Sequence, residues 1–227
     1  MADSETMLRM QGRSGEVVVR RAGGNVELIV NGVFLMDSGR NGASERALAR
    51  TVLGACASAE PACLVGGLGL GYTLAEILAV RPRARATCVE LEPAVIAGQR
   101  YVAGSCGIPA RVTEDPRVTI ETGDVLSWMS ATAERYDAIM LDVDNGPSWL
   151  VRPENCRLYD NAGVRLMAGA LKPAGVLGIW SAQAEDALAD RLAQAFLSLH
   201  TVTVPVVKGS PDIIYLASGH ATARSVK

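Results

Sequence analysis

Two carboxylates stand two residues apart after an apolar run, a placement in which they could hold or deprotonate an attacking amine. The run Ala138–Leu141 is followed by Asp142 and Asp144, and Asn145-Gly146-Pro147 then interrupts the pattern. A carboxylate at a strand end beside a bound cofactor can act as a general base. A metal site is the alternative, but no histidine lies nearby and two acids alone are a thin ligand set. We therefore predict that Asp142 and Asp144 are catalytic and that no metal is bound.

A glycine-rich segment between an apolar run and a predicted helix is the second candidate element. The segment reads Val-Gly-Gly-Leu-Gly-Leu-Gly over residues 65–71. Glycine allows the backbone to approach a ligand closely, and the N-terminus of the following helix can face that ligand. A tight connection with no ligand is the alternative, and from the letters alone it is about as good. The GxGxG spacing favours a sulfonium nucleoside such as S-adenosylmethionine over NAD, whose pattern is GxGxxG.

Two further strand-to-helix turns carry acids that suit a nucleoside. Glu90 and Leu91 end the next apolar run, where Glu90 can accept hydrogen bonds from both ribose hydroxyls or serve only as a surface acid beside a helix start. Asp124, between Gly123 and Val125, can accept from an adenine amino group or simply cap a helix. Ligands of open α/β sheets bind at the carboxyl edge of the strands. The predicted cofactor-binding residues are Gly66, Gly67, Gly69, Gly71, Glu90, Leu91, Gly123, Asp124, Val125 and Asp142.

The segment 148–155 contains one aromatic and one cationic side chain, Trp149 and Arg152. Most long loops only connect elements, but this one follows the acidic turn, where a lid would be useful. We therefore expect it to cover the substrate. The residues predicted to contact the substrate or to form its lid are Glu45, Asn145, Trp149 and Trp180.

Short apolar strands and helices alternate from residue 62 onward and must position these side chains. The predicted strands are Ala62–Val65, Ala86–Leu91, Val118–Glu121, Ala138–Leu141 and Val176–Trp180. The predicted helices are Tyr72–Val80, Ala94–Ala103, Val125–Met129, Asp160–Leu171 and Ala184–Leu199. Such alternation predicts an α/β fold with a parallel sheet. The last two strands, Thr201–Val207 and Ile213–Ala217, are joined by a link too short for a helical crossover, which predicts an antiparallel pair. The expected architecture is a Rossmann-like class I methyltransferase sheet of five parallel strands plus that pair.

The N-terminal residues 1–43 are predicted to form a small β-hairpin unit. Strand-like runs flank Asn31-Gly32, and Asn-Gly is the strongest short hairpin signal. Ser44 and Glu45 then open a helix that runs from Arg46 to about Ala57. We divide the chain into this unit and a Rossmann-like S-adenosylmethionine-binding domain over residues 44–227.

Composition argues against several classes of function. A chain of 227 residues with 49% hydrophobic content can bury one substantial core. The net charge is −2 and the Lys and Arg residues are scattered, so we expect no nucleic acid partner. No apolar run reaches the ~18 residues of a membrane helix, and the N-terminus has no apolar signal segment. The five cysteines are odd in number and form no CxxC pair, which suits a reducing compartment. We expect a cytoplasmic protein without membrane contact.

Taken together, these segments resemble the spermidine/spermine synthase superfamily over nearly the whole chain, and Gly66–Thr73 with Leu141–Pro147 resemble its spermidine synthase-like branch. The matching segments are Leu64–Gly67, Val89–Ile96, Asp115–Val118, Gly123-Asp124, Tyr136–Ile139 and Leu171–Val176. The resemblance implies that Glu90 holds ribose and that Asp124 and Val125 hold adenine. It also implies that Asp142 occupies the position of the acid that activates the amine acceptor, and that the chain is a homodimer.

The chain departs from the family pattern at positions that bind amines. Gly69 stands where aminopropyltransferases of the family carry an Asp that holds the donor's free amine. Asn145 stands in place of the second acid of the gate loop, and Trp180-Ser181 replaces an expected Gln. An unpaired ammonium in a closed site is costly. With these acidic positions replaced, the chain retains too few carboxylates to bind a dicationic amine.

We therefore expect a transferase that moves an alkyl group from a sulfonium nucleoside to a small nucleophile, by preference an amine. Methyl transfer from S-adenosylmethionine is slightly preferred over aminopropyl transfer from the decarboxylated form. The alternatives are an aminopropyltransferase of polyamine synthesis and a non-catalytic nucleoside-binding protein. An NAD-dependent oxidoreductase is a distant third.

Overall fold

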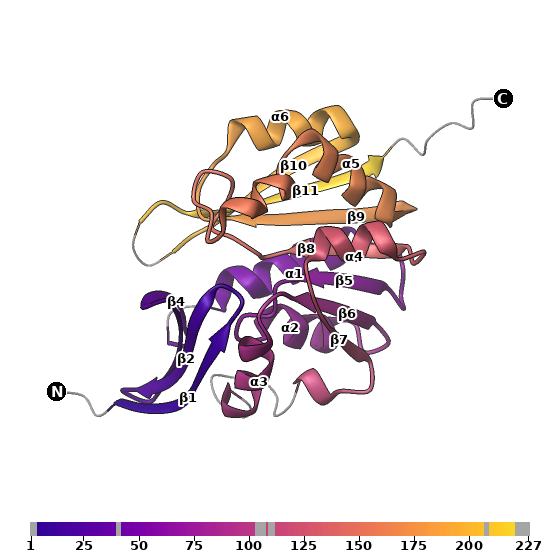
Figure 1. Cartoon of the computed structure of the whole chain (residues 1–227). Helices are drawn as coiled ribbons and strands as arrows, with labels where there is room; N and C mark the ends of the chain where they lie inside the picture. The colour runs from indigo at the N-terminus through magenta and orange to yellow at the C-terminus, as the bar shows by residue number, and fades with distance from the viewer. Residues whose placement is uncertain (1–3, 40–41, 103–107, 109–111, 207–208, 221–227) are drawn as a thin grey trace.

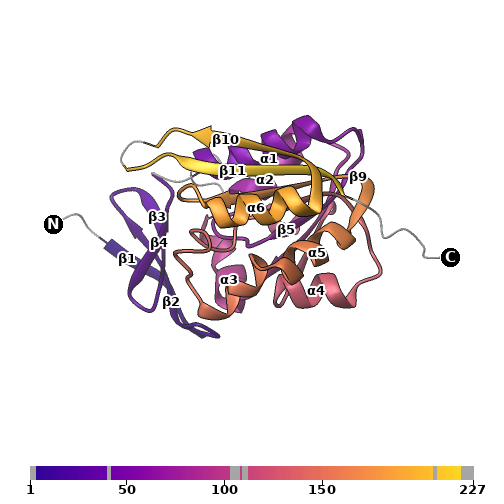
Figure 2. The ribbon, with the colours of Figure 1, turned by 90° about the horizontal axis from the view of Figure 1, so that it is seen from above.

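The structure, a computed structural model, describes residues 4–39, 42–102, 108, 112–206 and 209–220. Two sheets organise these residues, as Figure 1 shows. The N-terminal sheet is antiparallel, with the strand order β1-β2-β3-β4. The large sheet has seven strands in the order β10-β11-β9-β8-β5-β6-β7. The N-terminal sheet and the β10–β11 hairpin project on the same side of the large sheet in Figures 1 and 2.

The N-terminal unit is larger than the predicted hairpin. Its strands are β1 (Ser4–Gly12), β2 (Gly15–Ala22), β3 (Asn25–Val30) and β4 (Val33–Asp37). Asn31-Gly32 does form the turn between β3 and β4, as predicted. Strand β1 was missed because it is exposed along most of its length and therefore lacks an apolar alternation. Val17 and Val19 of β2 belong to the same buried cluster as the helices of the large domain.

A buried carboxylate holds the turn between β1 and β2 against the large domain. Glu92 Oε2 accepts a hydrogen bond from the Arg13 backbone N–H at 2.6 Å, and Oε1 accepts one from Ser14 N–H at 2.6 Å. Glu92 is only 6% exposed. Glu92 therefore satisfies two backbone donors of the turn and fixes the N-terminal sheet beside the carboxyl end of β6.

We expect Glu92→Ala to detach this turn. Hydrogen bonds to charged groups contribute about 1.5–3 kcal/mol each, so the variant should lose roughly that much stability or more. Amide hydrogen exchange should become much faster at Arg13 and Ser14, while Val18 and Val19, which are paired within the sheet, stay protected. Unchanged exchange at the two turn amides would show that Glu92 does not hold them.

The large sheet has the predicted topology. Its strands are β5 (Ala62–Gly66), β6 (Arg85–Glu90), β7 (Val118–Thr122), β8 (Tyr136–Leu141), β9 (Leu171–Ser181), β10 (Phe196–Val204) and β11 (Asp212–His220). Strands β5 to β9 pair in parallel, whereas β11 is antiparallel to both β9 and β10. The predicted α/β class, five parallel strands plus a C-terminal antiparallel pair, is confirmed.

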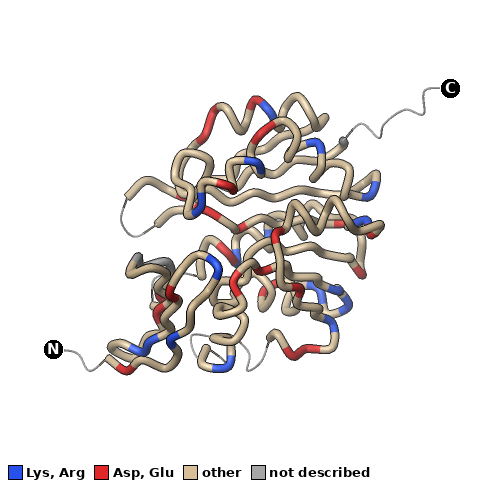
Figure 3. Tube along the Cα trace, viewed as in Figure 1, with Lys and Arg blue, Asp and Glu red and all other residues tan. Residues whose placement is uncertain are grey.

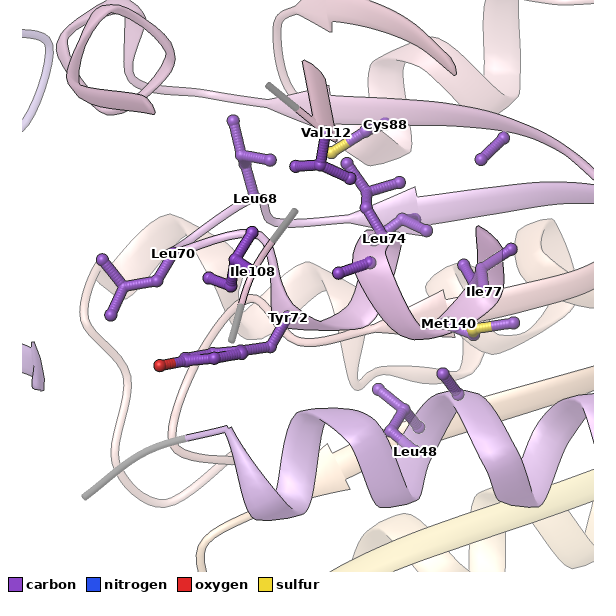
Figure 4. Close-up of a cluster of buried hydrophobic side chains, with 14 of the residues drawn as sticks. Leu48, Leu68, Leu70, Tyr72, Leu74, Ile77, Cys88, Ile108, Val112 and Met140 are labelled. Carbon is purple, nitrogen blue, oxygen red and sulfur yellow. The ribbon is translucent and has the colours of Figure 1, made fainter. Parts of the chain in front are cut away.

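Helices cover both faces of the large sheet. They are α1 (Ala43–Ala55), α2 (Tyr72–Val80), α3 (Pro93–Val102), α4 (Val125–Ala131), α5 (Asn161–Ala170) and α6 (Asp186–Ala195), with 3-10 turns at Val112–Glu114 and Pro153–Leu158. Successive β5 residues point to opposite faces, so Cys63 and Val65 join the cluster under α1 and α2, while Leu64 joins the cluster under α4, α5 and α6. Figure 4 shows Leu48 of α1 with Leu74 and Ile77 of α2 in the first of these clusters.

Several predicted ends of helices and strands were wrong. The largest error lies where strand pairing, and not the local sequence, sets the end of a helix. The helix predicted over Ala184–Leu199 ends at Ala195, and β10 begins at Phe196 because residues 196–204 pair with β11 along its whole length. Leu197 is 86% exposed on this edge strand, so it does not belong to a buried helix face. The first helix begins at Ala43 rather than Arg46. The division of the chain into two domains at residue 43 stays a prediction.

Within the described part of the chain, no helix has both the length and the apolar character needed to cross a membrane.

Candidate functional site

A cavity of about 930 Å³ lies at the carboxyl ends of the parallel strands, bounded also by the N-terminal sheet and the β10–β11 hairpin. Its volume is in the range of about 300–1,000 Å³ usual for small-molecule sites. The predicted site residues that line it are Glu45, Gly67, Gly69, Glu90, Leu91, Gly123, Asp124, Val125, Asp142, Asp144, Asn145, Trp149 and Trp180. Gly66 and Gly71 are the two that do not.

The glycine turn packs closely against the end of β8 and the residue that follows it. A β-carbon at Gly66 would lie 2.7 Å from Leu141 Cδ2, so this glycine lets β5 pack against the end of β8. At Gly67, where φ is +89°, a β-carbon would lie 2.2 Å from the Asp142 carbonyl oxygen. Gly71, with φ of +89°, is the N-cap residue of α2. Gly66 and Gly71 therefore shape the turn from behind, while Gly67 and Gly69 face the cavity.

Glu90 ends β6 and ties two turns together. Its Oε2 accepts from Leu68 N–H and its Oε1 from Glu92 N–H, both at 2.8 Å. Burial raises the pKa of this carboxyl, and the two backbone hydrogen bonds oppose that rise. Each carboxylate oxygen has a second lone pair, and the side chain lines the cavity. Glu90 can therefore hold the glycine turn and accept hydroxyl donors from a ligand at the same time.

Asp124 is the N-cap of α4. Its Oδ1 accepts from the Ser127 backbone N–H and from Ser127 Oγ, each at 2.8 Å. Its Oδ2 lies 3.8 Å from Arg157 Nη2. The capping alternative is thus correct, and because Asp124 also lines the cavity, the adenine contact stays a prediction.

Three carboxylates from distant segments gather beside the end of β8. Asp142 follows β8 directly, Glu45 lies in the first turn of α1, and Asp212 is the first residue of β11. Burial, with the neighbouring carboxylates of Glu45 and Asp212, raises the pKa of Asp142 to about 8. Burial also raises the pKa of Glu45, although Glu45 accepts from Gly42 N–H at 2.8 Å. At neutral pH the site can therefore take up and release a proton.

Asp212 was missed by sequence reasoning, which treated it as part of a connecting link. The sequence feature that could have located Asp212 was the predicted antiparallel pair at the C-terminal end of the sheet. Because β11 runs opposite to β9, its first residues lie where β9 ends, and Ile213 pairs with Ser181. An acid at the start of β11 therefore reaches the same sheet edge as the acids that follow the parallel strands.

Asp144 organises the loop predicted to be a lid. Its Oδ1 accepts from Val151 N–H at 2.6 Å, and the residue is 4% exposed. Its Oδ2 is buried and has no hydrogen-bond partner in the described structure. Trp149, in the same loop, lines the cavity while 64% exposed. The geometry gives Asp144 a role in holding the loop, and a catalytic role stays a prediction.

Met36 occupies the space beside Gly69. A β-carbon added at Gly69, where φ is +49°, would lie 2.6 Å from Met36 Sδ, and Met36 of β4 lines the cavity. An acid at position 69 would therefore collide with an apolar side chain from the N-terminal sheet. The part of the cavity next to the glycine turn is apolar at this point.

We expect Gly69→Asp to be destabilising because of this collision and because φ at this position, +49°, is a conformation that strains residues other than glycine. Overpacking typically costs about 1–3 kcal/mol, which for a chain of this size lowers Tm by roughly 2–12 °C. Met36→Ala should relieve the part of the penalty that comes from the collision but not the backbone strain, so the double variant should be more stable than the two single effects predict when added. Gly123→Ala is the matched control, since nothing lies within 4 Å of its added β-carbon. Strict additivity would show that Met36 does not fill the space.

The charged lining of the cavity is almost entirely acidic. Among the described lining residues, seven are carboxylates and Arg152 is the one cation. Figure 3 shows Asp and Glu positions along the side of the large sheet that faces the N-terminal sheet. Five of the seven accept hydrogen bonds from backbone N–H groups, namely Glu45, Glu90, Glu92, Asp124 and Asp144. The arrangement suits a ligand with positive charge.

Comparison with known proteins agrees with this geometry. The model of the spermine/spermidine synthase domain family matches residues 43–200. A curated polyamine aminopropyltransferase of Corynebacterium efficiens is 34% identical over 135 residues, which are 56% of this chain but 24% of that protein. The chain thus spans about a quarter of that relative's length.

Solved structures show the same fold. A spermidine synthase from Thermotoga maritima matches with a TM-score of 0.77 and 17% identity, covering 96% of this chain and 74% of that one. A probable spermidine synthase from Corynebacterium glutamicum matches at 0.70 and 18%, covering 97% and 82%. A spermidine synthase in complex with the transition-state analogue AdoDATO matches at 0.76 and 16%, covering 96% and 73%.

The expected preference for methyl transfer is wrong. The matching family model describes spermine/spermidine synthases, and the curated relative is a polyamine aminopropyltransferase, so both point to aminopropyl transfer. The expectation depended on a shortage of carboxylates, and that count omitted Asp212, which the fold brings to the cavity.

Proposed function

This chain belongs to the spermine/spermidine synthase family, and from that premise we propose that it transfers an aminopropyl group from decarboxylated S-adenosylmethionine to a small amine. The observation that carries the proposal is the acidic cavity at the carboxyl edge of the sheet. Its donor is a sulfonium cation and its acceptor an ammonium, so both ligands match the sign of the lining charge.

The donor nucleoside is assigned to the half of the cavity formed after β5, β6 and β7. Glu90 is buried, lines the cavity and has lone pairs left to accept from both ribose hydroxyls. Asp124 and Val125 are the adenine-binding residues, and the glycine turn supports the nucleoside from below. The rate enhancement comes mainly from holding the acceptor nitrogen in line with the sulfonium carbon.

Asp142 acts on the acceptor. An alkylammonium has no lone pair, so it must lose a proton before it can attack, and Asp142, with its pKa near 8, takes that proton. The neutral nitrogen then forms the N–C bond as the C–S bond breaks. The bonding electron pair stays on sulfur and gives a neutral thioether, so the leaving group needs no acid.

The test is direct detection of the two products. The protein is incubated with decarboxylated S-adenosylmethionine and a panel of mono- and diamines, and 5′-methylthioadenosine and the lengthened amine are measured. Formation of both in equal amounts supports the proposal. Tight donor binding by calorimetry, with no product from any amine, would instead favour a nucleoside-binding protein without catalysis.

We also propose that the chain acts in the cytoplasm as a homodimer. The support is the family membership and the exposed edge strand β1 of the N-terminal sheet. Light scattering on the purified chain tests the dimer, and a monomer at micromolar concentration would contradict it.

A further inference from the structure

Asp212 is held at the cavity by a contact that spans most of the chain. Ser44 Oγ of α1 donates a hydrogen bond to Asp212 Oδ2, across 168 residues of sequence. Asp212 lines the cavity together with its neighbours Pro205, Val206 and Ser210 from the β10–β11 link. The hairpin at the far edge of the sheet therefore supplies a fixed charge to the site.

The acids collect in the half of the cavity opposite the nucleoside residues. In the sheet order β10-β11-β9-β8-β5-β6-β7, Glu90 ends β6 and Asp124 follows β7, whereas Asp142 follows β8 and Asp212 begins β11. Beside the glycine turn, between these halves, Met36 presents a thioether rather than a charge. An ammonium in this cavity is therefore best stabilised on the β8–β11 side.

The carboxylates on that side have unused capacity for hydrogen-bond donors. Asp142, Glu45 and Asp212 repel one another, which costs free energy in the absence of a cation. Asp144 adds a buried Oδ2 without a partner, on a residue that is 4% exposed and lines the same cavity. The one cationic lining residue among those described, Arg152, lies beside Asp144 in the loop and interacts with it. A primary ammonium offers three N–H donors and one positive charge, which is what this cluster lacks.

We propose that Asp212 binds an ammonium group of the acceptor together with Glu45 and Asp142, and that Ser44 fixes Asp212 for that purpose. The identification of this ammonium as the acceptor's rests on the proposed function. Asp212 then determines specificity, because only an amine whose nitrogen reaches the start of β11 while facing the donor half gains this contact.

The test compares Asp212→Asn with Asp190→Asn, an exposed acid of α6 outside the cavity. Calorimetry measures binding of 1,4-diaminobutane and, separately, of 5′-methylthioadenosine. We expect Asp212→Asn to weaken diamine binding about 10- to 50-fold, as loss of one hydrogen bond to a charged group implies, and to leave nucleoside binding within about twofold. Asp190→Asn should change neither, and Ser44→Ala should weaken diamine binding by a smaller factor.

In turnover, Asp212→Asn should raise the acceptor KM far more than it lowers kcat, which a general loss of folding would not do. Equal diamine affinity in Asp212→Asn and the wild type overturns the inference, as does an effect on the nucleoside alone or a wild type that binds no diamine. If Asp212→Asn does not fold, diamine and nucleoside binding are compared between Ser44→Ala and the wild type instead, and equal diamine affinity again overturns the inference. The proposed function fails separately, when the wild type binds diamine and donor but forms no 5′-methylthioadenosine.

Discussion

Asp142→Asn is expected to lower kcat/KM for the amine acceptor by about 10²- to 10⁴-fold, the usual contribution of a positioned general base. Asparagine keeps the shape of the side chain but cannot take up the ammonium proton. Binding of 5′-methylthioadenosine should change little, since the nucleoside half of the cavity is intact. Turnover that is unaffected, with nucleoside binding also unchanged, would remove Asp142 from the mechanism.

The pH profile identifies the base. Because burial and the Glu45 and Asp212 carboxylates raise the pKa of Asp142 to about 8, the basic form increases with pH through that range. The wild-type kcat/KM should therefore rise up to about pH 8 on a limb that Asp142→Asn lacks. Deprotonation of the free amine adds a further rise at higher pH in both proteins, so the difference between the two profiles is the measurement.

The same group makes stability depend on pH. A carboxyl whose pKa is higher in the folded than in the unfolded protein binds more protons when folded. Its contribution is fully present below about pH 4 and is lost as the pH rises through about 8. Urea unfolding at pH 5 and pH 9 should thus show a larger loss of stability in the wild type than in Asp142→Asn. Asp190→Asn, the exposed control, should behave like the wild type. A loss of equal size in Asp142→Asn would mean that Asp142 does not titrate in this range.

Glu90→Gln is expected to weaken nucleoside binding about 100-fold. Glutamine has one acceptor oxygen where Glu90 has two, and its amide would face the N–H of Leu68 or of Glu92. Loss of hydrogen bonds from a charged acceptor to ribose hydroxyls costs roughly 3 kcal/mol, and 1.4 kcal/mol corresponds to tenfold in affinity. Calorimetry with 5′-methylthioadenosine measures the effect.

The control for this substitution is Glu121→Gln. Glu121 lies on the neighbouring strand β7, pairs with Val89 in the sheet and does not line the cavity. Both variants should be corrected for the folded fraction found by urea unfolding. If Glu90→Gln binds the nucleoside as tightly as Glu121→Gln does, then Glu90 serves only to hold the glycine turn.

The two halves of the cavity follow from the order of the strands. The residues proposed to bind the nucleoside lie at the carboxyl ends of β5, β6 and β7, while the acids proposed to bind the amine follow β8, begin β11 and lie in α1. The boundary between the halves is the glycine turn with Met36 beside it. This separation gives each substitution a distinct expected readout, nucleoside affinity for Glu90 and amine kinetics for Asp142 and Asp212.

The sequence by itself determined the parallel part of the sheet and the site residues that follow its strands. Gly67 and Asp142 directly follow β5 and β8, Glu90 ends β6, and Asp124 lies in the turn after β7, so each place at the sheet edge depends on one strand and one turn. Such features are local, so the pattern of apolar residues and glycines was enough. Helix α2 was predicted with the bounds that the structure has, since its start is marked by Gly71.

The tertiary structure alone decided the contacts between distant segments. Asp212 reaches Ser44 only because β11 pairs antiparallel with β9, and Glu92 meets Arg13 only because the N-terminal sheet packs on α3. Strand β1 has little apolar alternation, and the start of β10 looks like the continuation of a helix, so neither has a local signal of its own. The charge of the cavity depends on such pairings, and for that reason the sequence indicated the acids near the ends of the parallel strands but missed Asp212.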